Sequence, residues 1–340
     1  MTSHNFEMKD FWFYYLLAVM VAILGMCWIA FGNGMIYEAL HGEPMLPDPY
    51  TFVGMLMQQT ETDLGLPSDS ILASLAMTAE HWYMILSYLF PAAPSIAAIL
   101  IVWHFSRGTG VKSLFRCFST AQEGVSAAQG LKFLGVLFLA IVVYSLVFAT
   151  LSGISADGDI ASKFEALRLD APLVALLLLL VGSFTAHGAI LEELGWRGFA
   201  WPLLQKVMST PLRAAIFLGL LWGTWHLPRE VVMLAGGAPF DEFFLDQINF
   251  FMGAVTLTII IGWAVNKAGG SILPAIMIHG ASNYLGGTLG YDTVFLIFSI
   301  HDLLKIAIAI TVVAFTGSQL GYRGPSNAIG RSETIEAAGA

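Results

Sequence analysis

The run Glu192–Arg197 carries two adjacent carboxylates and an arginine in an otherwise apolar stretch of the sequence. Two later apolar stretches each hold a polar pair at a spacing of four residues: Trp222 with His226, and His279 with Asn283. Residues four apart lie on the same face of a helix. Ionisable side chains at membrane depth are costly and commonly mark function. These residues are therefore the candidates for chemistry.

The residue types in this set suit hydrolysis. A carboxylate and a histidine that converge can hold and deprotonate a water molecule. A second histidine and an asparagine can donate hydrogen bonds to the oxyanion that forms when this water attacks a carbonyl group. Alternatively, Glu192, His226 and His279 could bind zinc and leave a fourth position open. The sequence lacks the His-Glu-x-x-His signature of the common zinc proteases, so zinc is the second interpretation and no cofactor is expected to be obligatory.

Helical geometry separates the two glutamates. Glu193 and Arg197 are at i,i+4 and are predicted to pair, which would neutralise both charges. Glu192 is turned by about 100° from Glu193, so it can face a different helix. The indole of Trp222 is predicted to shape or shield the pocket beside His226. Glu193, Arg197 and Trp222 are therefore expected to support the site.

Composition identifies the class of protein. Of 340 residues, 57% are hydrophobic and 11% are charged, and the mean hydropathy is +0.74. Soluble domains carry about 25% charged residues, so this is a polytopic membrane protein. A net charge of -9 argues against nucleic acid as a partner, because nucleic acid requires basic patches. The two cysteines have no partner at metal-ligand spacing.

Apolar stretches of about 20 residues are long enough to cross a bilayer. We expect an all-α bundle with about eight transmembrane helices, forming a single membrane domain over residues 1–320. The catalytic core is expected at about 172–290, and the polar residues 321–340 are predicted to be a disordered tail. The eight stretches are 11–32, 83–103, 131–153, 174–205, 212–234, 248–266, 271–288 and 303–320.

Basic residues predict the orientation, because loops on the cytosolic side carry an excess of Lys and Arg. The first long loop, 33–81, contains neither residue. We therefore predict that both termini are cytosolic and that four basic residues lie outside: Lys163, Arg168, Arg229 and Lys305. Asp302 and Lys305 are predicted to form a local pair at the outer interface. The basic residues then predicted to lie inside are Lys9, Arg107, Lys112, Arg116, Lys132, Lys206, Arg213, Lys267, Arg323 and Arg331.

The candidate residues are predicted to lie at a similar depth. Glu192 and His226 are 14 and 13 residues from the basic residues that flank the turn at 206–213, or about 20 Å along a helix. His279 is 12 residues beyond Lys267, or about 18 Å. Three helices would thus bring a carboxylate and two imidazoles to nearly one level. Unrelated core polar residues would not be expected to do this.

The three motifs resemble those of the CAAX protease and bacteriocin-processing family of intramembrane endopeptidases, which includes the type II CAAX prenyl endopeptidases. They are Glu-Glu-x-x-x-Arg at 192–197, aromatic-x-x-x-His at 222–226 and His-x-x-x-Asn at 279–283. The resemblance covers about 172–290. Trp222 departs from the phenylalanine that is common at its position.

The resemblance implies roles for individual residues. Glu192 with His226 would activate the water, and His279 with Asn283 would form the oxyanion hole. It also implies a cavity that reaches the cytosolic side of the membrane.

The expected function is an intramembrane endopeptidase in a prokaryotic cell membrane. Its partners would be the lipid bilayer and a peptide or membrane-anchored protein as substrate, with no nucleic acid. One alternative is a non-catalytic scaffold or immunity-type protein that binds a peptide without cutting it. Another is an ion-coupled transporter, since Glu, Arg and His also build relays in membranes. Transporters commonly show repeated halves, and the sequence shows no repeat.

Overall fold

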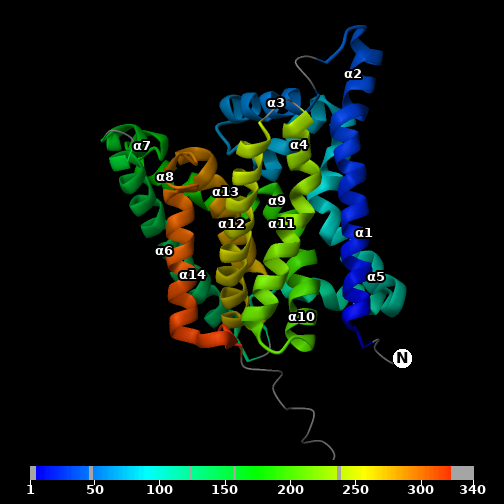
Figure 1. Cartoon of the computed structure of the whole chain (residues 1–340), viewed down its shortest axis with the longest axis vertical. Helices are drawn as coiled ribbons and strands as arrows, with labels where there is room; N and C mark the ends of the chain where they lie inside the picture. Colours follow the sequence, from blue (N-terminus) through cyan, green and yellow to red (C-terminus); the bar gives the residue numbers. More distant parts are fainter. Residues whose placement is uncertain (1–4, 46–48, 123, 156–157, 236–238, 323–340) are drawn as a thin grey trace, which may run out of the picture.

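The computed structural model describes residues 5–45, 49–122, 124–155, 158–235 and 239–322. These residues form a bundle of upright helices with shorter helices across one end (Figure 1). The all-α membrane bundle predicted from composition is confirmed. The predicted tail at 321–340 lies almost wholly outside the described residues.

Among the described residues, five helical segments are long and apolar enough to cross a membrane: 8–41, 82–118, 127–155, 240–267 and 300–319. The first joins α1 (Met8–Cys27), a π-helical turn and α2 (Asn33–His41), and the second is built around α5 (Leu89–Leu114). The third and fourth are α6 (Ala127–Ser155) and α12 (Phe240–Lys267), and the fifth contains α14 (Ile300–Thr316). Each of the eight predicted stretches overlaps a helix, but the number of crossings stays a prediction.

The stretch predicted at 174–205 is broken rather than continuous. It consists of α8 (Pro172–Thr185), α9 (His187–Glu193), the π-helical segment Leu194–Ala200 and α10 (Trp201–Val207). At Ala186 the backbone leaves the helix, with ψ at 119°, and the N–H of His187 donates to the carbonyl of Asp69 at 2.7 Å. A distant segment therefore satisfies the backbone at this break, as membrane-embedded backbone requires.

The predicted outer loop at 33–81 is mostly helical. Besides α2 it contains α3 (Pro49–Leu64) and α4 (Ile71–Glu80). In Figure 1, α3 lies across the top of the bundle. A short hairpin of β1 (Thr293–Phe295) and β2 (Phe298–Ser299) precedes α14 and was not predicted.

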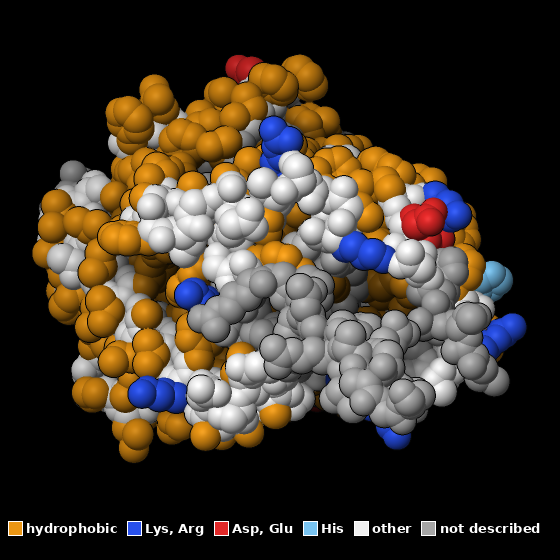
Figure 2. Space-filling model, turned by 90° about the horizontal axis from the view of Figure 1, so that it is seen from below, with side chains coloured by type: hydrophobic (Ala, Val, Ile, Leu, Met, Phe, Trp, Pro, Cys, Tyr) orange, Lys and Arg blue, Asp and Glu red, His pale blue; other side chains and the backbone are white. Residues whose placement is uncertain are grey.

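Both ends of the described chain lie at the lower end of the bundle in Figure 1. Lys206 near the end of α10, Arg213 in α11 (Pro211–Ala235) and Lys267 at the end of α12 mark this end in the sequence. We call it the basic end. Seen from below, its charged side chains are mostly Lys and Arg (Figure 2). The cytosolic orientation of the termini stays a prediction, and this distribution agrees with it.

Close packing brings the motif-bearing helices together. The helix α13 (Leu273–Leu289) packs against α8 and α9, and α11 packs along α12. Gly280 makes the first contact possible, because a Cβ atom at this position would lie 2.3 Å from the carbonyl oxygen of Ser183 on α8. Small residues at such crossings allow helix backbones to approach closely.

We predict that Gly280→Ala lowers the stability of the bundle, because α8 and α13 must move apart to admit the methyl group. Overpacking of this kind costs about 1–3 kcal/mol. The matched control is Gly287→Ala on the same helix, where a Cβ atom would meet nothing within 4 Å. Thermal denaturation in detergent should show a lower midpoint for Gly280→Ala alone. Equal midpoints for the two variants would contradict the packing argument.

Candidate active site

Trp222 on α11 lies at the centre of the candidate residues. Its indole Nε1 donates to Oε2 of Glu192 on α9 at 2.8 Å. The ring lies edge-on to His279, with centroids 5.0 Å apart, and 6.0 Å from the ring of His226. The guanidinium of Arg197 sits over the same indole at 4.5 Å from its centroid. One side chain therefore contacts residues from all three motifs.

The carboxylate of Glu193 contacts two basic side chains. Oε1 of Glu193 accepts a hydrogen bond from Nη1 of Arg197 at 2.8 Å and lies 2.9 Å from Nδ1 of His279. Arg197 also donates to the hydroxyl of Thr258 on α12 at 3.2 Å. The predicted Glu193–Arg197 pair is thus present and almost fully buried. It also reaches His279, a contact that the sequence spacing did not indicate.

Glu192 and Asn283 flank one small open space. An added Cβ atom at Gly188 would lie 3.3 Å from Oε1 of Glu192 and 3.7 Å from Nδ2 of Asn283. Gly188 precedes Glu192 by one helical turn, so any larger side chain there would fill this space. The glycine leaves room for a small group between the carboxylate and the carboxamide.

His226 is surrounded by aromatic rings. The centroids of Trp225, Phe250 and Phe90 lie 4.7, 5.0 and 5.9 Å from its own. Its Nδ1 atom is buried and has no hydrogen-bond partner among the residues that the structure describes. The apolar surround fixes the ring and leaves Nε2 as the nitrogen that can act in the cavity.

Glu192, Trp222, His226, His279 and Asn283 all line one cavity of about 1180 Å³. The carboxylate and the two imidazole residues are 4%, 6% and 3% exposed, respectively. The sequence predicted that three distant segments converge, and in the structure they do. Which residue performs which chemical role stays a prediction.

The cavity extends away from the basic end of the bundle. Its exposed lining residues belong to α3, to the end of α7 (Ile160–Ala166), to the start of α12, and to the end of α13 with the turn that follows. They are Gly54, Gln58, Ala166, Asp246, Gly287 and Tyr291. The resemblance implies a cytosolic opening, whereas the basic residues predict that the basic end is cytosolic. In this structure the two expectations are incompatible.

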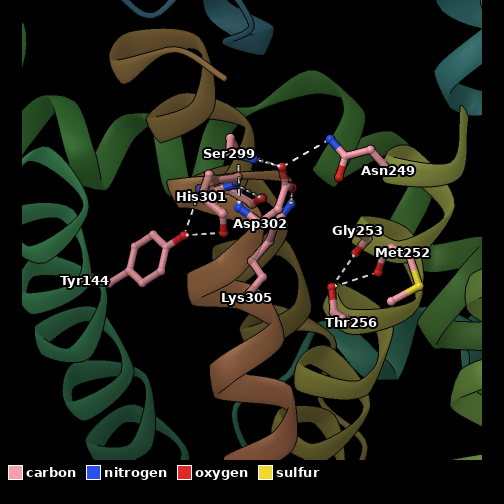
Figure 3. Close-up of polar contacts among 10 residues, drawn as sticks. Tyr144, Asn249, Met252, Gly253, Thr256, Ser299, His301, Asp302 and Lys305 are labelled. Atoms are coloured by element: carbon pink, nitrogen blue, oxygen red, sulfur yellow. Dashed lines mark hydrogen bonds and ion pairs between the residues drawn. The ribbon is translucent and has the colours of Figure 1, made fainter. Parts of the chain in front are cut away.

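Sequence reasoning missed that an ion pair lines the same cavity. Lys305 Nζ lies 3.1 Å from Asp302 Oδ1, and both residues line the cavity. The pair was predicted, but at the outer interface, and in the structure its side chains are only 12% and 7% exposed. Figure 3 shows that Asp302 also accepts from Ser299, and from Asn249 Nδ2 at 3.2 Å. Residues on two other elements therefore anchor this carboxylate.

A second missed network holds α13 in place. The hydroxyl of Ser282, between His279 and Asn283 in the chain, lies 3.0 Å from Nε2 of His301. Nδ1 of His301 lies 2.8 Å from the hydroxyl of Tyr144 on α6 (Figure 3). These contacts tie the face of α13 that bears the third motif to two neighbouring helices. The position of Ser282 within that motif is the one sequence signal that could have indicated it.

The arrangement of the donor side chains bears on the zinc interpretation. Within the described chain, no group of three or more His, Cys, Asp or Glu side chains is placed to hold a metal ion. Glu192, His226 and His279 are among the residues searched, and as arranged here they do not fit a zinc site.

We predict that Glu193→Leu is strongly destabilising, because it leaves the guanidinium of Arg197 buried without a carboxylate. Removing one partner of a buried pair costs about 3–5 kcal/mol. The double variant Glu193→Leu/Arg197→Met should recover most of the loss, since it buries no unpaired charge. Denaturation midpoints in detergent measure both effects. A double variant as unstable as the single one would show that the pair does not act as a unit.

Comparison with known proteins agrees with this geometry. Residues 170–285 match the family model described as type II CAAX prenyl endopeptidase Rce1-like. The chain is also 33% identical over 153 residues to a protein of Methanococcus maripaludis named CAAX prenyl protease 2. That match covers 44% of this chain and 54% of the relative, so the chain spans about half the length of the curated relative. The resemblance seen in the three motifs is therefore confirmed: residues 170–285, which carry them, are similar to the Rce1-like type II CAAX prenyl endopeptidases.

Proposed function

We propose that this protein is an intramembrane endopeptidase that cleaves a peptide bond with a water molecule activated inside the cavity. One observation carries the proposal: Trp222 contacts Glu192, His226 and His279 at once, on the wall of a cavity large enough for a peptide segment. The family match of residues 170–285 supports it.

In this proposal Glu192 is the general base. Its Oε2 accepts the indole N–H of Trp222, which leaves Oε1 facing the space beside Gly188. A water molecule there could give its proton to Oε1 as its oxygen attacks the substrate carbonyl. Nε2 of His226 would orient the water, and the proton held on Oε1 of Glu192 would pass to the leaving amine as the peptide C–N bond breaks. The confinement of His226 by aromatic rings keeps the imidazole in one position.

His279 and Asn283 would stabilise the oxyanion. A carboxylate can only accept a hydrogen bond, so the contact with Glu193 means that Nδ1 of His279 carries a proton. Nε2 can then donate to an oxyanion only if the ring is an imidazolium. The proposal therefore requires the imidazolium form of His279 when the oxyanion is bound. Nδ2 of Asn283 would supply the second donor.

Glu193 and Arg197 would then act as supports. Their pair is buried, and through Oε1 of Glu193 it sets the orientation of the His279 ring. Such outer contacts keep reacting groups within the tolerance that catalysis requires. The substrate is proposed to be a peptide or membrane-anchored protein, and the protein to reside in a prokaryotic cell membrane. The name of the relative adds a prenylated C-terminal tail as one substrate to be tested.

We predict that Glu192→Gln and His226→Ala each abolish cleavage while leaving the fold intact. The carboxamide introduced by Glu192→Gln could still accept the hydrogen bond of Trp222 but could not take a proton. Loss of a general base typically costs 10²–10⁴-fold. The assay uses purified protein with a library of membrane-anchored peptides, including one with a farnesylated cysteine fourth from its C-terminus.

The same assay is run with and without a chelator. We expect wild-type cleavage to be indifferent to the chelator. Inhibition that added zinc reverses would instead establish metal dependence. Full cleavage by Glu192→Gln would contradict the proposed base. Binding of a peptide by the wild type without any cleavage would favour the non-catalytic scaffold.

We also predict that Trp222→Phe lowers kcat about tenfold with little change in KM. Phenylalanine keeps an aromatic ring beside both histidines but removes the only hydrogen bond recorded to the Glu192 carboxylate in the described structure. A tenfold loss corresponds to about 1.4 kcal/mol, the usual net worth of such a bond. Trp201→Phe, which removes an indole N–H that bonds Asn266 rather than Glu192, is the matched control. An equal loss in both variants would assign the effect to packing.

A further inference from the structure

We propose that substrate reaches the catalytic cavity from the end of the bundle opposite the basic end, which is the non-cytosolic side, and that the site prefers neutral or cationic peptide segments. This inference rests on the proposed endopeptidase function. It goes beyond that function by assigning the side of access and the charge of the substrate.

The lining residues show which end the cavity belongs to. On α11 and α13, which both run upward from the basic end, the lining begins only at Trp222 and His279, respectively. On α12, which runs downward, it ends at Leu257, ten residues before the basic Lys267. Each helix therefore contributes the half that lies away from the basic end.

The basic end is closed beneath the site. Within the described chain, the lining includes no residue of the π-helical segment Leu194–Ala200 or of α10. Trp196 and Trp201 fill this region, and Trp225 lies at the level of the site between Trp222 and His226 on α11; all three are at most 1% exposed. The indoles of Trp196 and Trp225 pack edge to face, with centroids 5.7 Å apart. A peptide approaching from the basic end would meet this packed layer.

The sidedness follows from the basic residues. Lys206, Arg213 and Lys267 all lie at the closed end, and basic residues near helix ends favour the cytosolic side. The open end carries α3, α4 and the segment 33–81, which contains no Lys or Arg. The cavity therefore opens away from the cytosol. A prenylated tail displayed in the cytosol would face the closed end.

The charges of the cavity indicate the class of peptide. Acidic lining residues outnumber Lys and Arg by five to two: Asp69, Glu192, Glu230, Asp246 and Asp302 against Arg229 and Lys305. Both cations are already paired, Arg229 with Glu230 and Lys305 with Asp302, and Figure 3 shows the second pair within its network. The negative excess attracts cations and repels anionic segments.

Cysteine accessibility tests the side of access without requiring activity. In a background with Cys27→Ala and Cys117→Ala, Asp246→Cys places a thiol at the cavity mouth. Lys267→Cys places one at the other end of the same helix as a matched control. Both native residues are exposed. A membrane-impermeant maleimide should label Asp246→Cys in right-side-out vesicles and Lys267→Cys only in inverted ones. The reverse pattern would overturn the proposal.

Cleavage tests the charge preference. Two library peptides identical except for Lys-Lys or Glu-Glu flanks are added to right-side-out vesicles. We expect kcat/KM to be about fivefold higher for the Lys-Lys peptide at low salt, and the difference to shrink at high salt. Asp246→Asn should reduce the preference. Equal rates, or a preference for Glu-Glu, would overturn the assigned substrate charge.

The outcomes separate this inference from the function on which it rests. Glu192-dependent cleavage that occurs only in inverted vesicles would retain the endopeptidase and refute the access route. Outward labelling of Asp246→Cys without cleavage of any library peptide on either side would retain the access route and refute the endopeptidase.

Discussion

The burial of charge in an apolar bundle is the constraint on which the structure depends. Glu192, Glu193 and Arg197 lie within six residues and are at most 4% exposed, and each would be costly at this depth without a partner. Arg197 and His279 both turn to Glu193, while Glu192 receives the indole N–H of Trp222. The adjacent carboxylates of Glu192 and Glu193 therefore have different partners and different roles. Both structural contacts go to Glu193, and Glu192 keeps one carboxylate oxygen facing open space.

The same constraint explains why glycine and aromatic residues surround the site. Gly188 leaves space where the free carboxylate oxygen and Asn283 face each other, and Gly280 lets α13 approach α8 closely enough to bring that asparagine in. The aromatic rings around His226 exclude other polar groups from its buried nitrogen. Further out, Tyr144, His301 and Ser282 fix the rotation of α13. The acidic lining of the cavity and its position in the bundle are the basis of the proposed access route.

The sequence could predict what depends on spacing within one helix. The i,i+4 pairing of Glu193 with Arg197 and the shared depth of Glu192, His226 and His279 both follow from helical geometry. Contacts between distant segments could not be predicted in this way. Nothing near Ala186 signals a helix break, because the partner of the next residue is Asp69. The sequence predicts Lys305 and Asp302 at the outer membrane interface. No local pattern shows that α14 turns these side chains towards α12.

The central claim is that Glu192 and His226 act together on one water molecule. The most direct test is the kcat of Glu192→Gln, His226→Ala and the double variant, measured on one peptide under single-turnover conditions. Residues that act as a unit are strongly non-additive. We expect the double variant to be no slower than the slower single variant. Multiplicative losses would show that the two side chains act independently, and would contradict the account.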